Sequence, residues 1–145
     1  MFRHILLPTD GSPLSEAAMR KGIQFAKTIN ARVTGFCVVP ALPYVGCEAE
    51  IGAEFKKQAE AAVHAEVNKN LLAIEKAAKE AGVPCEAVQE KNVQPYEAII
   101  EAARKKECDL IIMASHGRRG VGALLLGSET QKVLTHSKIP VLVYR

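Results

Sequence analysis

The stretch Asp109-Leu110-Ile111-Ile112-Met113-Ala114 decides the fold of this chain. Its apolar residues run without the polar alternation of a half-exposed strand, which is typical of a strand buried on both faces of a parallel sheet. Other β-type runs lie at 4–7, 32–39, 85–89 and 139–144, with helical stretches between them. The alternating order predicts an α/β fold: a doubly wound, five-stranded parallel sheet with helices on both faces.

Local signals place the ends of the predicted helices. Ser12 and Pro13 predict a helix start, with the serine as N-cap and the proline at the first helical position. An Ala-, Glu- and Lys-rich segment predicts a long helix over 53–81, closed by Gly82 as its C-terminal cap. The remaining helices are expected to open at Pro95 and at Ser128.

Composition limits the classes of function. The chain has 145 residues and a formal net charge of +3, so we expect one domain over 1–145 that folds without disulfides or a metal. We find no membrane-spanning run and no secretory signal, and we expect a cytoplasmic protein with no membrane partner. Scattered basic residues and the lack of tryptophan argue against a nucleic-acid partner. The four cysteines form no C-x-x-C pair, which argues against a zinc site.

The segment 115–128 carries the most chemical information. It leaves the buried strand and ends at a predicted helix start, where Ser128 and Gln131 fit a capping box. Backbone amides at such a start favour an anion, and Gly117 and Gly127 would let a phosphate approach the backbone. Arg118 and Arg119 add positive charge at the rim. Two interpretations stay open at this point, a phosphate cradle and a glycine-rich turn with an ordinary helix cap.

Three further polar residues near the strand ends need weighing. Glu129, in the first turn of the predicted helix, would repel a phosphate unless it points away. Asp10 is either the residue of an ordinary Asx-turn or a ligand-binding carboxylate. His116 is assigned to the rim, because no serine or cysteine nucleophile with an Asp-oriented base is evident. We therefore assign no catalytic residue.

Three other folds that bind nucleotides or phosphate are excluded, because each requires residues that this sequence lacks. A Walker A loop requires Gly-Lys-Ser/Thr, and no such run precedes Ser128. A dinucleotide-binding fold places Gly-x-Gly-x-x-Gly after the first strand, where Pro8-Thr9-Asp10-Gly11 stands instead. A phosphoacceptor receiver domain requires an acidic pair after the first strand, and Asp10 is alone.

Over its full length the chain resembles the universal stress proteins. The resemblance is carried by the opening Ile5-Leu6-Leu7-Pro8-Thr9-Asp10-Gly11-Ser12, by the pair Gly127-Ser128, and by the closing Pro140-Val141-Leu142-Val143. The ATP-binding branch of that family carries Gly, two residues, Gly, nine residues, Gly and then Ser or Thr. Gly117, residues 118–126, Gly127 and Ser128 match this pattern, whereas Ala114 stands in place of the first glycine.

The resemblance implies a Rossmann-like fold of the adenine nucleotide-binding type, with ATP and Mg²⁺ held between the ends of the first and fourth strands. Asp10 would contact the ribose hydroxyls or the adenine side, and Ser128 would also reach the Mg²⁺. The resemblance also implies a homodimer through the final strand. The implied pocket residues are Pro8, Thr9 and Asp10 along one wall, Val38 and Met113 at the adenine, and Ala114, His116, Gly117, Arg118, Gly127, Ser128 and Glu129 around the phosphates.

Three functions are compatible with these residues to different degrees. The expected one is a stress-response protein that binds ATP as a sensor or switch and hydrolyses it slowly at most. The alternative is a nucleotide-free, dimeric interaction module with an unidentified protein partner, in which Ala114 and Glu129 mark a lost site. The third is an adenylating enzyme, for which the chain shows neither a base nor a second, substrate-binding domain.

Overall fold

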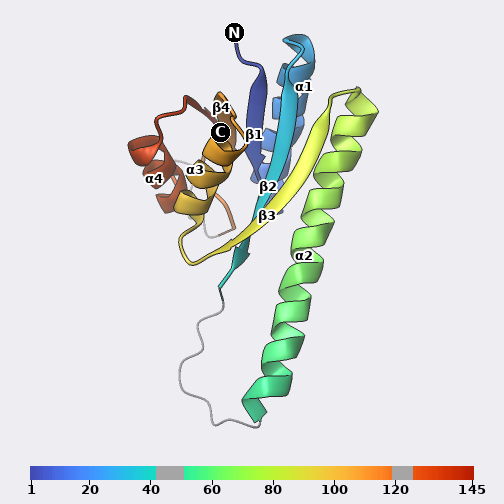
Figure 1. Cartoon of the computed structure of the whole chain (residues 1–145), viewed down its shortest axis with the longest axis vertical. Helices are drawn as coiled ribbons and strands as arrows, with labels where there is room; N and C mark the ends of the chain where they lie inside the picture. Colours follow the sequence, from blue (N-terminus) through green and yellow to red (C-terminus); the bar gives the residue numbers. More distant parts are fainter. Residues whose placement is uncertain (42–50, 119–125) are drawn as a thin grey trace.

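The structure is a computed structural model that describes residues 1–41, 51–118 and 126–145. Its five strands form one sheet in the order β3-β2-β1-β4-β5, and all four neighbouring pairs are parallel. This confirms the predicted fold class (Figure 1). The elements are β1 His4–Pro8, α1 Pro13–Thr28, β2 Arg32–Pro40, α2 Ile51–Ala81, β3 Cys85–Asn92, α3 Pro95–Lys105, β4 Leu110–Ala114, α4 Ser128–His136 and β5 Val141–Tyr144.

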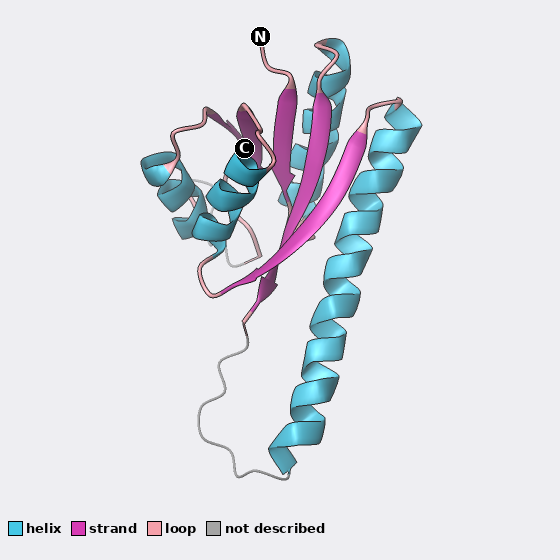
Figure 2. Ribbon diagram, viewed as in Figure 1, coloured by secondary structure: helices cyan, strands magenta, loops and turns pink. Residues whose placement is uncertain are grey.

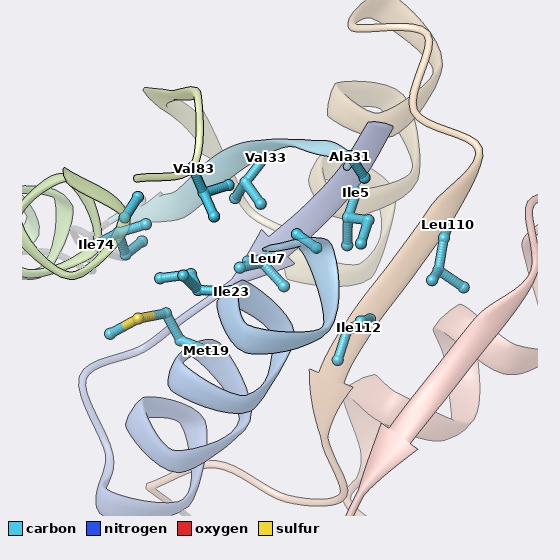
Figure 3. Close-up of a cluster of buried hydrophobic side chains, with 12 residues drawn as sticks. Ile5, Leu7, Met19, Ile23, Ala31, Val33, Ile74, Val83, Leu110 and Ile112 are labelled. Carbon is cyan, nitrogen blue, oxygen red and sulfur yellow. The ribbon is translucent and has the colours of Figure 1, made fainter. Parts of the chain in front are cut away.

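Helices cover both faces of the sheet, with α1 and α2 on one side and α3 and α4 on the other (Figure 2). Successive strand residues point to opposite faces, so Ile5 and Leu7 pack toward α1 and α2 while Leu6 packs toward α3. Figure 3 shows the first of these clusters, in which Met19 and Ile23 of α1 meet the strand side chains. The central strands are therefore buried on both faces, as the apolar run at 109–114 predicts for β4.

The observed element ends differ from the predicted ones by more than one residue at three places. β3 continues to Asn92, because its backbone pairs with β2 as far as Pro40 even though its own side chains are mostly polar. β5 begins only at Val141, and Pro140 lies just before it, where the missing N–H removes no sheet hydrogen bond. α2 begins at Ile51, slightly earlier than expected.

The order of the strands creates the site. The chain winds outward from β1 through β2 to β3, then returns to the other side of β1 for β4 and β5. The direction of winding reverses between β1 and β4. In open parallel sheets a crevice forms at this point, beyond the carboxyl ends of the strands. The residues after Pro8 and after Ala114 therefore face each other.

A buried polar cluster lies at the opposite end of the sheet. His4 on β1 is 4% exposed, and its Nε2 lies 2.7 Å from Oγ1 of Thr34. The Thr34 hydroxyl donates to Glu86 Oε1 at 3.1 Å, so its oxygen accepts from His4, which is thus protonated at Nε2. His4 Nδ1 is the single buried side-chain nitrogen or oxygen that lacks a partner in the described ranges.

This cluster predicts a pH-dependent stability. Burial, and then the charge of Arg32, lower the pKa of His4 below its ordinary 6.5, while Glu86 and Asp109 partly oppose them. The unfolded chain therefore takes up the proton more readily, so the free energy of unfolding should fall as pH drops below 6.5 and level off beneath the folded pKa. We expect urea unfolding to show lower stability at pH 5.5 than at 7.5, and a smaller difference in His4→Gln. An equal pH dependence in both proteins would contradict this assignment.

Candidate functional site

The turn after β1 is built by short-range hydrogen bonds. The Thr9 amide donates to the Phe36 carbonyl at 2.9 Å, which ties the turn to β2. Asp10 Oδ1 accepts from the Ser12 amide at 2.9 Å, so Asp10 does form the Asx-turn that its sequence context predicts. The Ser12 hydroxyl in turn accepts from the Ser15 amide and caps α1, which confirms the predicted helix start.

Asp10 also reaches across to the segment that follows β4. Its Oδ2 accepts from the Arg118 amide at 2.9 Å. Gly117 packs so closely that a Cβ there would collide with the same oxygen. Burial raises the pKa of the Asp10 carboxyl, but hydrogen bonds from Ser12 and from the Arg118 amide outweigh it and hold the pKa below its ordinary value. Asp10 is therefore an ionised acceptor at the meeting point of two loops.

The two ends of the segment between β4 and α4 lie next to each other. The Gly127 amide donates to the Ser115 carbonyl at 2.7 Å, and a Cβ on Gly127 would stand 3.1 Å from Cα of His116. Thr130 Oγ1 donates to the Ala114 carbonyl at 3.0 Å and holds α4 against the end of β4. Asp10, Gly117, His116 and Gly127 thus form one continuous cluster, while 119–125 lie outside the described residues.

The predicted capping box at the start of α4 is wrong. The N-cap is Gly127, in an extended conformation, and Ser128 is the first helical residue. Gln131 does not return to the N-cap backbone; its Nε2 donates to the Leu126 carbonyl at 3.1 Å. The helix starts one residue early because the Gly127 amide is held by Ser115. Since Gly127 has no side chain, the first-turn amides of α4 receive no N-cap hydrogen bond.

Glu129 is engaged elsewhere and does not compete for those amides. Its Oε2 accepts from the Tyr96 amide in the first turn of α3 at 2.8 Å, and its Oε1 accepts from Lys132 Nζ at 3.1 Å. The N-cap of α3, Gln94, makes no side-chain cap bond, so Glu129 fills this role from another helix. From the sequence, Glu129 was expected to repel a phosphate unless it points away. In the structure its carboxylate binds the Tyr96 amide of α3 and the Lys132 side chain.

The residues expected at the adenine lie on a single face of the sheet. Val38 of β2 is partly buried and packs against the cluster that contains Met113 and Phe36. Met113 and Ala114 are themselves buried at the end of β4. Val38 is therefore the more accessible of the expected adenine contacts, and Met113 belongs to the buried cluster against which Val38 packs.

Two residues of α2 reach the site and were not found from the sequence. Arg118 Nη2 donates to Glu66 Oε1 at 2.5 Å. One helical turn further along, Asn70 lies against the β1–α1 turn, and a Cβ on Gly11 would stand 2.5 Å from its Oδ1. Glu66 and Asn70 lie beside the α2 residues that pack on the sheet, such as Val67 and Ile74. Because both are remote from the two loops in sequence, no local pattern indicated that they contact the site.

Other features of the described residues lie away from this cluster. A hollow of about 210 Å³ lies between β3 and α3, and none of its lining residues belongs to the candidate site. No three or more His, Cys, Asp or Glu side chains gather in a metal-binding arrangement within 1–41, 51–118 and 126–145. In the same ranges, no helix has the length and apolar character to cross a membrane.

The sequence model of the universal stress protein family matches residues 1–145, the whole chain. The chain belongs to the universal stress protein family. Universal stress protein MJ0531 of Methanocaldococcus jannaschii is 34% identical over 145 residues, which cover 100% of this chain and 83% of that protein. The resemblance inferred from the opening, the glycine pair and the closing strand is thereby confirmed.

Solved structures agree with this assignment. The structure of hypothetical protein MJ0577, used for a structure-based assignment of biochemical function, matches this universal stress protein with a TM-score of 0.80 and 30% identity, covering 99% of this chain and 95% of that one. A universal stress protein in complex with cAMP matches with a TM-score of 0.73 and 25% identity, covering 99% of this chain and 97% of that one.

Proposed function

We propose that this protein is a cytoplasmic universal stress protein that binds ATP with Mg²⁺ between β1 and β4 and acts as a sensor or switch in the stress response. The observation that carries the proposal is the convergence of the two loops: Gly117 packs on Asp10 while Gly127 returns to Ser115 beside the uncapped start of α4. The family relation and the related protein in complex with cAMP support an adenine nucleotide as the ligand.

The residues present fit such a ligand. Each Asp10 carboxylate oxygen accepts a hydrogen bond from one backbone amide, and an ionised carboxylate oxygen can accept a second one, which suits it to accept from ribose hydroxyls. The first-turn amides of α4, with the helix dipole, suit a phosphate. Pro8 and Thr9 would form the wall beside the ribose, and Val38 would contact the adenine.

The metal would enter with the nucleotide. Ser128 is exposed at the first position of α4, where its hydroxyl would reach an Mg²⁺ that the phosphates carry. Mg²⁺ is commonly held by phosphate oxygens, water and one or two protein oxygens, so a dedicated cluster of carboxylates is not required. His116 would stay at the rim, and no residue is assigned a catalytic role.

The direct test is to denature the purified protein and analyse the released small molecules for nucleotide, followed by calorimetric titration with ATP. We expect an adenine nucleotide in the released fraction, or saturable ATP binding by the emptied protein. Absence of nucleotide together with no saturable titration at millimolar ATP would overturn the proposal.

Asp10→Asn tests the role of the carboxylate. The amide accepts hydrogen bonds at one atom and lacks the charge, so the variant should bind ATP about tenfold more weakly, which corresponds to about 1.4 kcal/mol. Binding of inorganic triphosphate, which has no ribose, should change much less. Equal losses for the two ligands would leave Asp10 with only its structural role in the turn.

A nucleotide-free interaction module remains the second candidate, and specific observations favour it. Ala114 places a methyl group where the ATP-binding branch has its first glycine. The amides of Gly127 and Arg118 already donate to protein oxygens, so they are not available to a phosphate without rearrangement. The released-nucleotide experiment separates the two candidates, because a module of this kind carries no ligand.

We further propose a homodimer through β5. β5 is an edge of the sheet and pairs only with β4 among the strands of the described ranges, and its Leu142 side chain is 42% exposed. An edge strand with an apolar outward residue is suited to pairing with a second copy.

Leu142→Lys should weaken this dimer, because a lysine on an edge strand disfavours pairing. Light scattering at a fixed protein concentration should show a shift toward monomer. Leu72→Lys makes the same change on α2, at a side chain that is 64% exposed, and should leave the dimer intact. A dimer that persists in Leu142→Lys would exclude β5 as the contact.

A further inference from the structure

The helix α2 forms a third wall of the candidate nucleotide site. It runs alongside the sheet and extends beyond the carboxyl ends of β2 and β3 (Figure 1). Glu66 and Asn70 lie four residues apart on α2, so they project from one side of the helix. Asn70 packs against Gly11 of the β1–α1 turn, and Glu66 pairs with Arg118 of the other loop. α2 thus contacts both loops that meet at Asp10.

Arg118 connects the two halves of this arrangement. Its amide donates to Asp10 Oδ2 at 2.9 Å, and its guanidinium Nη2 lies 2.5 Å from Glu66 Oε1. The residue before it, Gly117, lies directly against Asp10. The guanidinium is therefore anchored within reach of the site by its backbone, while its charge is held by a carboxylate of α2.

The same guanidinium group is a strong partner for phosphate. A guanidinium binds carboxylate and phosphate through the same planar arrangement of N–H donors, so the two are interchangeable partners of Arg118. The ion pair with Glu66 is half-exposed, at 54% of the Arg118 side chain and 44% of the Glu66 side chain. An exposed pair of this kind is weak and readily exchanged.

We propose that Glu66 lowers the affinity of the nucleotide site for phosphorylated ligands: it competes with the ligand's phosphates for Arg118, and so weakens the binding of ATP relative to that of adenosine. The inference rests on the proposed nucleotide function. With Asp10 and Glu66 both acidic, the site tolerates a polyanion only when Arg118 turns from Glu66 toward it. A triphosphate has the charge to draw Arg118 away, and an uncharged nucleoside does not.

The test is a double-mutant cycle in which calorimetry measures the affinity for ATP and for adenosine. Glu66→Gln keeps the shape of the side chain and removes its charge, so the phosphates no longer have to displace Glu66 from Arg118. ATP should then bind about two- to fivefold more tightly, which is the factor that corresponds to the free energy of an exposed ion pair. Adenosine affinity should not change. In the Arg118→Gln background, Glu66→Gln should have no further effect on ATP, because the contested group is gone.

A matched charge removal elsewhere on α2 shows whether position matters. Glu75→Gln removes the same charge about 13 Å further along the helix axis and should leave ATP affinity unchanged. If Glu66→Gln tightens ATP equally with and without Arg118, the charge acts through space and the competition is overturned. If the wild type binds ATP but Glu66→Gln has no effect, this inference alone fails. If no variant binds any adenine ligand, the proposed function fails and this inference fails with it.

Discussion

Gly127→Val is expected to abolish measurable ATP binding while the fold persists. A Cβ at this position would stand 3.1 Å from His116 Cα and 3.3 Å from the Ser115 carbonyl oxygen, and both are backbone atoms that cannot rotate away. The two methyl groups of valine add to this contact and push the start of α4 away from the end of β4. The backbone of Gly127 is itself extended, with φ −60° and ψ 151°, so valine meets no conformational strain there.

Calorimetric titration with ATP checks this prediction, and circular dichroism checks the fold. We expect an affinity loss of at least about two decades, or about 3 kcal/mol, for valine. Gly127→Ala introduces only the Cβ and should give an intermediate loss. Unchanged ATP affinity in the valine variant would remove Gly127 from the binding site, whatever the alanine variant does.

Phe36→Ala should cause the largest loss of stability. Phe36 on β2 is 1% exposed and belongs to the cluster that joins the sheet to α3 and α4. Removing a buried aromatic ring loses its burial energy and leaves a cavity, which costs about 3–5 kcal/mol. Its carbonyl also accepts from the Thr9 amide, so a shift of β2 would disturb the turn that carries Asp10.

Phe55→Ala provides the matched control, because Phe55 on α2 is 73% exposed. The same chemical change there should alter the free energy of unfolding by no more than about 0.5 kcal/mol. Urea unfolding followed by circular dichroism measures both variants. Similar losses for the two phenylalanines would contradict the assignment of Phe36 to the core.

The three conclusions rest on one another in sequence: the role of Glu66 requires nucleotide binding, and nucleotide binding requires the fold. The family membership and the fold stand on the comparisons and on the sheet topology. Nucleotide binding adds the convergence of the two loops at Asp10, and the role of Glu66 adds the ion pair with Arg118. A failure at the last step leaves the earlier ones in place, which is why ATP affinity of the wild type is measured first.

The sequence by itself determined the order and type of the elements. Periodicity and cap residues are local signals, so Ser12 at the start of α1 and Gly82 after α2 could be read directly, and Gly82 has the positive φ of 72° that such a cap adopts. The apolar runs likewise indicated strands buried on both faces. From these the strand ends that form the candidate site also followed, with Asp10, Gly117 and Gly127 among its residues.

Only the tertiary structure decided which groups are available at that site. The Asp10–Arg118 contact joins residues 108 apart in the chain, the Arg118–Glu66 pair spans 52, and the Glu129–Tyr96 contact spans 33. Such contacts depend on the order of strands in the sheet and on the direction in which each helix crosses it, and neither is encoded in a local pattern. For the same reason the capping box at Ser128 was wrong: the hydrogen bond from the Gly127 amide to the Ser115 carbonyl, absent from any local motif, set where the helix begins.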